Sequence, residues 1–458
     1  MRIIADFHFH SRFSRACSKD LTIPNLEKIA AFKGVHLLGT GDFTHPQWFA
    51  EIKKILEPAE PGLYKVKNQY SLQRFNLSPA LSSPGEGEAA GAAGAGLSAS
   101  SKKSKVRFVL SCEISSIYKQ GEKVRRIHTV FVMPSIDSAS RFREALVSRG
   151  ANLSSDGRPI VGISAEELAK IALDIDKKTM VIPAHIWTPW FSMFGSMSGF
   201  DSVEECFGKM APFVFAVEMG MSSDAPMNWR VKNLDRLALL ASSDAHSLRR
   251  IAREGNVFEL PSPQDLSYDW IYNVIKKKDP KVFLYTIKYY PQEGRYHYDG
   301  HDKCNFSCKP QETKKLKGIC PKCGRSLTVG VLARVEELAD PNRPEGYRPK
   351  NAIPTRHLVP LEEVIADALG KGVQTKTVQS AYEDLVQKAG GEYQVLLDLS
   401  YEKLAELTQP IIVEGIKRNR EEKLYIEPGF DGRYGKIQIF TETEREKFSS
   451  GGSQKALF

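Results

Sequence analysis

The sequence has 458 residues, of which 41% are hydrophobic, with a formal net charge of +9 and a pI of about 9.0. This length exceeds the usual size of one domain, so two or three domains are expected. No apolar run is long enough to span a bilayer and no secretory signal opens the chain, which argues against a membrane protein and predicts a cytoplasmic one. The positive charge favours an anionic partner such as nucleic acid or a membrane surface, or it is simply the charge of a basic protein without such a partner.

Residues 1–290 predict an α/β domain. Short apolar runs rich in Val, Ile and Leu alternate with helical segments such as 23–33 and 164–175, and strands buried on both faces have this composition. The alternation is typical of an α/β barrel or a doubly wound sheet. Residues 78–104 are rich in Gly, Ala and Ser, have little to bury, and predict a disordered insertion. The predicted strands are 3–8, 35–40, 106–113, 127–133, 179–185, 212–219 and 237–244.

Side chains that bind metals gather at the ends of these runs. Functional groups of barrel proteins lie where strands end, although His128 opens its run and needs an antiparallel neighbour to reach the same edge. Imidazole and carboxylate suit zinc, with magnesium or manganese as alternatives, and the set exceeds what one zinc ion needs, so two or three divalent ions are predicted. The simpler alternative treats each residue as an ordinary polar strand end. The candidates are His8, His10, Asp42, Glu113, His128, His185, Asp244 and His246.

Four cysteines crowd into residues 304–323. Cys304, Cys308, Cys320 and Cys323 follow the pattern C-x3-C, eleven residues, C-x2-C, which predicts a structural zinc site in a ribbon-like module over residues 291–345. Two disulfides are the alternative, but they belong to an oxidising compartment. The surrounding lysines fit contact with a phosphate backbone or, more simply, a solvated face.

Helical patterns at 361–370, 378–389 and 401–421 predict a helical C-terminal domain over residues 346–440. A flexible tail is expected over residues 441–458. The end of that tail, with Gln454, Leu457 and Phe458, is similar to a truncated sliding-clamp-binding box, or it is a plain disordered end.

The motif order in the first domain resembles the PHP domain: HxH at 8–10, then Glu113, His128, His185, and DxH at 244–246. The resemblance implies a distorted barrel of seven βα units with a trinuclear metal site. The sequence departs from it at "TGD", where Asp42 stands at a position that is commonly histidine. Such a cluster activates water for phosphoester hydrolysis, with Asp244, His246 and Glu113 as catalytic residues and Asp244 also as a base.

A PHP domain followed by a four-cysteine module and C-terminal helices resembles the endonuclease Q family, and "GTGDFTHP" (39–46) and "SSDAHS" (242–247) support the likeness. It implies a DNA repair endonuclease. Such an enzyme cuts the phosphodiester 5′ to a deaminated base (uracil, hypoxanthine or xanthine) or an abasic site and leaves 3′-hydroxyl and 5′-phosphate ends. The rival functions are a phosphatase or nucleotidase for a small phosphoester and a DNA-binding adaptor without catalysis.

Reading a base outside the duplex needs a shaped pocket with aromatic walls. The substrate-binding candidates are therefore Trp187, Trp190, Phe191, Ser223, Asp224, Asn228 and Trp229. For the aromatic residues, packing beneath the rim of the barrel is the alternative.

Overall fold

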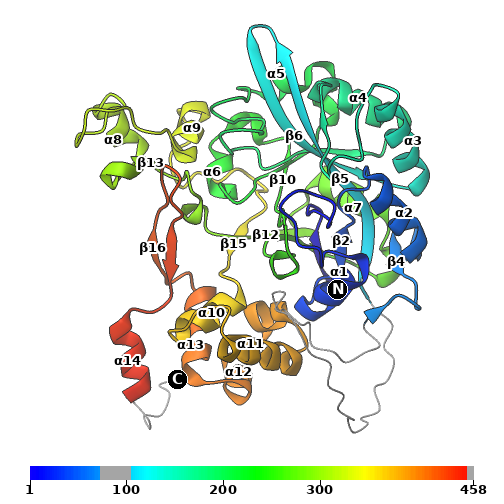
Figure 1. Ribbon diagram of the computed structural model, residues 1–458. Helices are drawn as coiled ribbons and strands as arrows, with labels where there is room; N and C mark the ends of the chain where they lie inside the picture. The colour runs from blue at the N-terminus through cyan, green and yellow to red at the C-terminus, as the bar shows by residue number, and fades with distance from the viewer. Residues whose placement is uncertain (73–104, 451–458) are drawn as a thin grey trace.

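The computed structural model describes residues 1–72 and 105–450, so the insertion predicted at 78–104 and the end of the tail lie outside the described residues. A distorted α/β barrel is followed by a small Cys-rich module (residues 299–328) and by the C-terminal helices (residues 361–420) (Figure 1). The predicted fold class is confirmed. Among the described residues, no helix is both long and apolar enough to cross a membrane.

All seven predicted strands are present. β1 pairs in parallel with β2, and β2 with β5, whereas β6 is antiparallel to both β5 and β8. β9 and β10 form a separate parallel pair. The strand that carries His128 therefore has the antiparallel neighbour that its position required. The strands are β1 (Arg2–Asp6), β2 (Leu37–Gly39), β5 (Arg107–Gln120), β6 (Lys123–Met133), β8 (Met180–Pro183), β9 (Ala216–Glu218) and β10 (Ala238–Leu240).

Further strands extend the sheet on both sides. β11 (Gly255–Glu259) is antiparallel to β1, β12 (Phe283–Lys288) is antiparallel to β11, and β15 (Thr355–His357) is parallel to β12. β15 follows the Cys-rich module in sequence, so the chain returns to the barrel sheet before it enters the C-terminal helices. The short strands β3 (Leu56–Pro58), β4 (Tyr64–Val66) and β7 (Ile160–Val161) lie on the β5 side.

Amphipathic helices cover the outside of the barrel. In α4 the Ser164 hydroxyl caps the helix by accepting a hydrogen bond from the Glu167 amide, and the apolar side chains from Leu168 to Leu173 are buried. This is the segment expected at 164–175, and α1 coincides with the one expected at 23–33. The helices are α1 (Ile23–Lys33), α2 (Pro46–Ile55), α3 (Ile136–Val147), α4 (Ala165–Ile175), α5 (Val203–Phe207), α6 (Ala225–Trp229) and α7 (Tyr268–Lys277).

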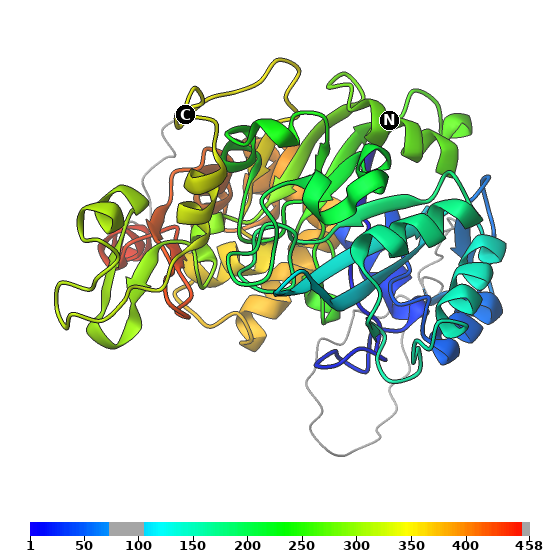
Figure 2. The ribbon, with the colours of Figure 1, turned by 90° about the horizontal axis from the view of Figure 1, so that it is seen from above.

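The Cys-rich module stands apart from the barrel, as the view from above shows (Figure 2). A hairpin from the end of the chain, β16 and β17, returns to it: between the two strands, Asp431 accepts hydrogen bonds from the Asp302 amide and from the Thr328 hydroxyl. The helix α14 occupies the first part of the tail that was expected to be flexible. The elements are β13 (Asp299–His301), β14 (Phe306–Cys308), α8 (Pro310–Lys315), α9 (Val331–Leu338), α10 (Leu361–Ala368), α11 (Lys376–Ala389), α12 (Tyr401–Leu407), α13 (Pro410–Arg420), β16 (Tyr425–Glu427), β17 (Lys436–Gln438) and α14 (Glu442–Ser450).

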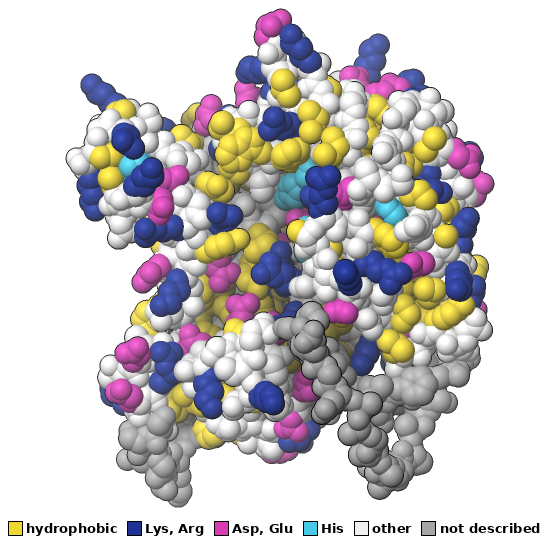
Figure 3. All heavy atoms as spheres, in the orientation of Figure 1, with side chains coloured by type: hydrophobic (Ala, Val, Ile, Leu, Met, Phe, Trp, Pro, Cys, Tyr) yellow, Lys and Arg dark blue, Asp and Glu magenta, His cyan; other side chains and the backbone are white. Residues whose placement is uncertain are grey.

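The surface is hollowed where the barrel, the Cys-rich module and the C-terminal helices meet, and histidine side chains show beside the hollow (Figure 3). Asp244, which follows β10, lines a cavity here together with residues from the Cys-rich side and the C-terminal helices, such as Tyr296 and Glu362. The fold therefore exposes one edge of the barrel between its two accessory regions.

Candidate metal centre

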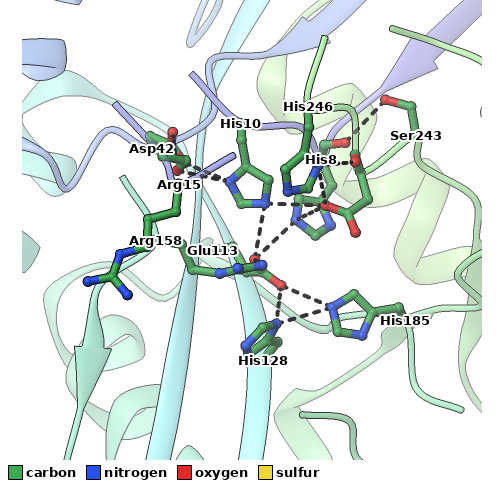
Figure 4. A network of polar contacts seen from close by, with 12 residues as sticks. His8, His10, Arg15, Asp42, Glu113, His128, Arg158, His185, Ser243 and His246 are labelled. Carbon is green, nitrogen blue, oxygen red and sulfur yellow. Dashed lines mark hydrogen bonds and ion pairs between the residues drawn. The ribbon is translucent and has the colours of Figure 1, made fainter. Parts of the chain in front are cut away.

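Seven of the eight predicted ligands converge, although they are spread over some 240 positions of the chain (Figure 4). Among the described residues they form three overlapping groups whose ligand atoms lie within 4.8 Å of one another. The groups are His8, His10 and Glu113; His10, Asp244 and His246; and Glu113, His128 and His185. Neighbouring groups share a residue, so the donor atoms form one continuous cluster.

Glu113 lies at the centre and contacts imidazoles on both sides. Its Oε1 is 2.9 Å from Nδ1 of His128 and 3.2 Å from Nε2 of His185, and its Oε2 is 3.3 Å from Nε2 of His10. The register of the β5–β6 hairpin explains the first contact. Ser115 pairs with His128, and Glu113, two residues from Ser115, shares its face of the sheet.

His8 and His10 direct the same ring atom toward the cluster. Nδ1 of His8 is 2.9 Å from Oε2 of Glu218, and Nδ1 of His10 is 3.0 Å from Oδ1 of Asp42. Their Nε2 atoms are buried without a hydrogen-bond partner among the described residues. A carboxylate behind a ring with a free nitrogen in front is the usual arrangement of a metal-binding histidine. The donor set therefore fits a bound divalent cation.

Asp244 closes the cluster toward the hollow. Its Oδ1 is 3.2 Å from Nε2 of His10 and has no hydrogen-bond partner among the described residues. The backbone of Asp244 has a φ of 44°, and that of His185 a φ of 29°. Left-handed backbone is uncommon outside glycine and gathers at functional sites, which agrees with a ligand role for both residues.

Asp42 is placed differently from the prediction. Both of its oxygens are used behind the cluster, Oδ1 by His10 and Oδ2 by the amide and hydroxyl of Ser11 and the hydroxyl of Ser14. In this structure Asp42 contacts His10 and the two serines and does not join the three ligand groups. This placement supports a role in orienting His10, and direct metal binding by Asp42 stays a prediction.

Glu218 was missed by the sequence reasoning. It ends β9, the sixth predicted run, and its Oε2 accepts hydrogen bonds from Nδ1 of His8 and from the His185 amide at 3.1 Å. The sequence does contain a signal for Glu218: it ends the apolar run "FVFAVE", just as the other candidate ligands stand at the ends of apolar runs. Arg158, whose Nη1 is 3.2 Å from Oε2 of Glu113, carried no such signal.

The electrostatics favour ionised carboxylates. Burial alone would raise the pKa of Glu113, but the neighbouring His128, Arg158 and His8 hold that pKa well below its ordinary value. Burial alone would lower the pKa of His8. The negative charges of Glu218 and Glu113 outweigh this effect and raise the pKa of His8 well above its ordinary value. Protons must leave the histidines before their nitrogens bind a cation, so metal affinity is expected to rise with pH.

A second cluster lies in the Cys-rich module. His301, Cys304, Cys320 and Cys323 place one donor atom each within 4.8 Å of the others. The Cys308 thiol lies 3.2 Å from the Thr313 hydroxyl and is not part of this group, so metal binding by Cys308 stays a prediction and His301 is an alternative fourth donor. The signal for His301 was its H-x2-C spacing to Cys304. Three thiolates and one imidazole make a usual structural zinc site, so this donor set fits zinc.

A cavity of about 930 Å³ extends from the metal cluster into the hollow. Asp244 and His246 belong to its wall. Trp190 and Tyr296 form another part of the wall, with ring centroids 6.4 Å apart. Arginines at 249, 250 and 253 line it as well. A space of this size with mixed aromatic and cationic walls accommodates a nucleotide unit of a polyanion.

The comparisons with known proteins agree with this geometry. The crystal structure of the lesion-specific endonuclease PfuEndoQ from Pyrococcus furiosus aligns with a TM-score of 0.78 and 30% identity over 96% of each chain. Endonuclease Q in complex with a 27-mer duplex bearing an abasic lesion aligns with a TM-score of 0.77 and 30% identity, over 97% of this chain and 98% of that one. This chain belongs to the endonuclease Q family. The predictions of the family and of a metal-dependent endonuclease are confirmed.

Sequence comparison gives further relatives of this endonuclease Q family member. The family model of the MJ0043 C-terminal domain matches residues 360–423. MJ0043 of Methanocaldococcus jannaschii is 38% identical over 258 residues, which is 55% of this chain and only 31% of that protein. YqxK of Bacillus subtilis is 30% identical over 319 residues, 68% of this chain and 74% of that protein.

Within the endonuclease Q fold, several predicted substrate-binding residues lie inside the protein. Trp187 is fully buried and its indole N–H donates to Oδ1 of Asn228 at 2.8 Å, and Asn228 in turn donates to the Ser223 hydroxyl at 3.0 Å. Asp224 is buried, caps α6 and pairs with His357. Trp187, Asn228 and Ser223 are linked to one another, and the Asp224 carboxylate contacts the Met227 amide and His357. These contacts support packing beneath the rim, and substrate binding by the four residues stays a prediction.

Three aromatic candidates remain closer to the surface. Trp190 is 42% exposed and lines the cavity beside the metal cluster. Phe191 is half-buried, with its ring 4.9 Å from that of His128. Trp229 is half-buried under the Arg348 guanidinium and lines a different cavity, so it does not join the other two.

Proposed function

We propose that this chain is a DNA repair endonuclease that hydrolyses the phosphodiester 5′ to a deaminated base (uracil, hypoxanthine or xanthine) or to an abasic site. The products are a 3′-hydroxyl and a 5′-phosphate. The observation that carries the proposal is the ligand cluster at the head of a cavity of about 930 Å³, in a chain that aligns end to end with a lesion-specific endonuclease. A related structure holds a duplex with an abasic lesion at its active site.

Several residues of the cluster would bind the cations directly, and others would orient those ligands. Nε2 of His8 and His10, the Glu113 carboxylate and Oδ1 of Asp244 would hold the ions, with Asp42 and Glu218 fixing the two ring orientations. Bound divalent ions polarise a phosphoryl oxygen and lower the pKa of a water toward about 7. Zinc is the first candidate here, with magnesium or manganese as alternatives, and zinc would occupy the Cys-rich module.

The remaining residues position the nucleic acid. Trp190 and Tyr296 offer ring faces on which an unstacked base can lie. Asp244 and His246 form the side of the cluster that faces the cavity, so the reacting phosphate would meet them first. The catalytic assignment therefore stays with Asp244, His246 and Glu113.

The two rival functions predict other outcomes in the same assay. The protein is incubated with labelled duplexes that contain uracil, hypoxanthine, xanthine, an abasic site or only normal bases, with Mg²⁺, Mn²⁺ or Zn²⁺. Nicks only on the 5′ side of the lesion, with ends that a ligase can use after repair synthesis, support the proposal. Hydrolysis of p-nitrophenyl phosphate without nicking identifies a small-molecule phosphatase, and binding without nicking identifies an adaptor.

Asp244→Asn provides the internal control, because it keeps the size of a side chain that contacts His10 and removes its charge. Nicking should be lost while lesion DNA is still bound, and nicking at the wild-type rate would contradict the assigned role. Binding to the sliding clamp stays a prediction, since Gln454, Leu457 and Phe458 lie outside the described residues.

A further inference from the structure

A tight loop brings Arg158 to the metal cluster. Gly157 is packed against Asp42 and Ser14, and a Cβ at this position would overlap both of their side-chain oxygens. The Gly157 amide also donates to the Phe13 carbonyl at 3.0 Å. The loop is thereby pressed against the carboxylate that orients His10, which only glycine permits.

The residues on either side of Arg158 are fixed as well. The Arg158 amide donates to Oδ1 of Asp156 at 3.1 Å, and the Pro159 carbonyl accepts from the Ser115 amide at 3.0 Å. Strand β7 then begins and pairs with β5 next to Ser115. A loop held at three consecutive positions aims the Arg158 side chain in one direction, toward Glu113.

The guanidinium is only partly used by the protein. Its Nη1 lies 3.2 Å from Oε2 of Glu113, and no other carboxylate among the described residues lies within ion-pair distance. Its side chain is 29% exposed, whereas that of Glu113 is fully buried. Arginine has five N–H donors in a planar fork, so the contact with Glu113 uses only part of them.

An arginine here is electrostatically costly once cations occupy the cluster. Glu113 is shared by three histidines that would hold divalent ions, and a permanent positive charge beside them is repelled. An anion between the ions and the guanidinium removes that repulsion. Arginine is also the side chain whose geometry matches two oxygens of a phosphate.

We propose that Arg158 is a catalytic residue that donates hydrogen bonds to a non-bridging oxygen of the scissile phosphate and stabilises its growing negative charge. This proposal rests on the proposed function. In the step itself, the oxygen of a water bonds to phosphorus and the bond from phosphorus to O3′ breaks. One proton of the water passes to O3′, so one water yields the 3′-hydroxyl and the 5′-phosphate, and Arg158 keeps its proton throughout.

The first test compares Arg158→Gln, Arg158→Lys and the matched control Arg149→Gln under single turnover. Glutamine retains an N–H donor beside Glu113 and removes the charge. Arg149 precedes β7 as Arg158 does, but it is 44% exposed and faces Glu167 on the outside. Arg158→Gln should cleave about 10²-fold to 10³-fold more slowly, as for the loss of one transition-state donor, with DNA affinity within about threefold of wild type. Arg158→Lys should recover part of the loss.

The second test asks which atom Arg158 contacts. A methylphosphonate at the scissile position replaces one non-bridging oxygen by a methyl group in each of two stereoisomers. One stereoisomer should slow wild type strongly and slow Arg158→Gln much less, because the contact is already absent. Equal slowing in both proteins would overturn the proposal.

Two further readouts distinguish a catalytic Arg158 from an arginine that only supports the metal ligands. Metal content per chain should be the same in Arg158→Gln and wild type, and recovery of full activity at high metal concentration would show that Arg158 merely supports Glu113. Cleavage by Arg158→Gln within about threefold of wild type would also overturn the proposal. Absence of nicking by wild type on every lesion would instead refute the proposed function.

Discussion

One carboxylate oxygen positions two ligands of the metal centre, which makes Glu218 the sharpest test of the arrangement. Its Oε2 accepts from Nδ1 of His8 at 2.9 Å and from the amide of His185 at 3.1 Å. Glu218→Gln keeps the shape of the side chain and removes the charge. The His8 ring then loses its ionised acceptor, and the backbone that carries His185 with a φ of 29° loses its anchor.

Loss of a carboxylate behind a metal-binding histidine lowers metal affinity by about 10-fold to 100-fold. Because Glu218 acts on two ligands, we expect the upper end of that range, which corresponds to about 2.8 kcal/mol. The assay is titration of metal-free protein with Mn²⁺, followed by the electron paramagnetic resonance signal of the free ion. Mn²⁺ suits the imidazole and carboxylate donors of the barrel and not the thiolates of the Cys-rich module, so the two sites are distinguished.

The matched control is Glu204→Gln, because the Glu204 side chain is 60% exposed and pairs only with Arg236 at the surface among the described residues. Cleavage by Glu218→Gln should need correspondingly more Mn²⁺ and should approach the wild-type rate at saturation. An affinity within twofold of wild type, in a variant with unchanged melting temperature, would show that Glu218 does not orient the ligands.

Three further predictions concern the rest of the molecule. In the Cys-rich module, Cys308→Ser should leave the thiolate-to-cobalt absorption of the Co²⁺-loaded protein unchanged, whereas His301→Ala should alter the spectrum; a weaker band in Cys308→Ser would restore Cys308 as a ligand. Asn228→Ala should destabilise the fold by about 1–3 kcal/mol in urea unfolding, because the buried indole N–H of Trp187 loses its acceptor, and a smaller loss would mean that the indole finds water. Burial alone would lower the pKa of His357, but hydrogen bonds to Asp224 and Glu422 outweigh burial and raise this pKa to about 9. The charged form is favoured in the folded state, so its contribution of about 3 kcal/mol should be present below pH 6.5 and lost as pH rises through 9. The difference in unfolding free energy between wild type and His357→Ala should therefore shrink at high pH, where only the packing of the ring against Tyr290 remains, and a constant difference would contradict the pKa.

The sequence located the metal centre because strand ends are easy to recognise and meet at one edge of a barrel. His8, His10, His185 and Asp244 all follow apolar runs directly, and each reaches the cluster. The strand-end rule also selected Glu113 and His128, although neither residue stands at the end of a strand. They lie within the long strands β5 and β6, and the antiparallel register rather than a strand end brings them together.

The same rule could not separate ligands from the residues behind them. Asp42 follows β2 by about three residues and Glu218 ends β9, and each contacts Nδ1 of a cluster histidine. Whether a carboxylate faces the ions depends on which local donors satisfy it, and Ser11 and Ser14 decide this for Asp42. Those contacts arise from the turn after β1, whose conformation no residue pattern specifies.

The aromatic residues after His185 show where residue type misleads most. Trp187 and Trp190 are three residues apart on one loop, yet the first is buried and the second is 42% exposed beside the cavity. Asn228, which lies 41 positions away, accepts the hydrogen bond of the Trp187 indole. A buried indole N–H usually has such a partner, so Trp187 can lie inside the protein. The environment of these aromatic residues therefore depends on partners distant in sequence, whereas the ligand cluster follows from the order of the strands.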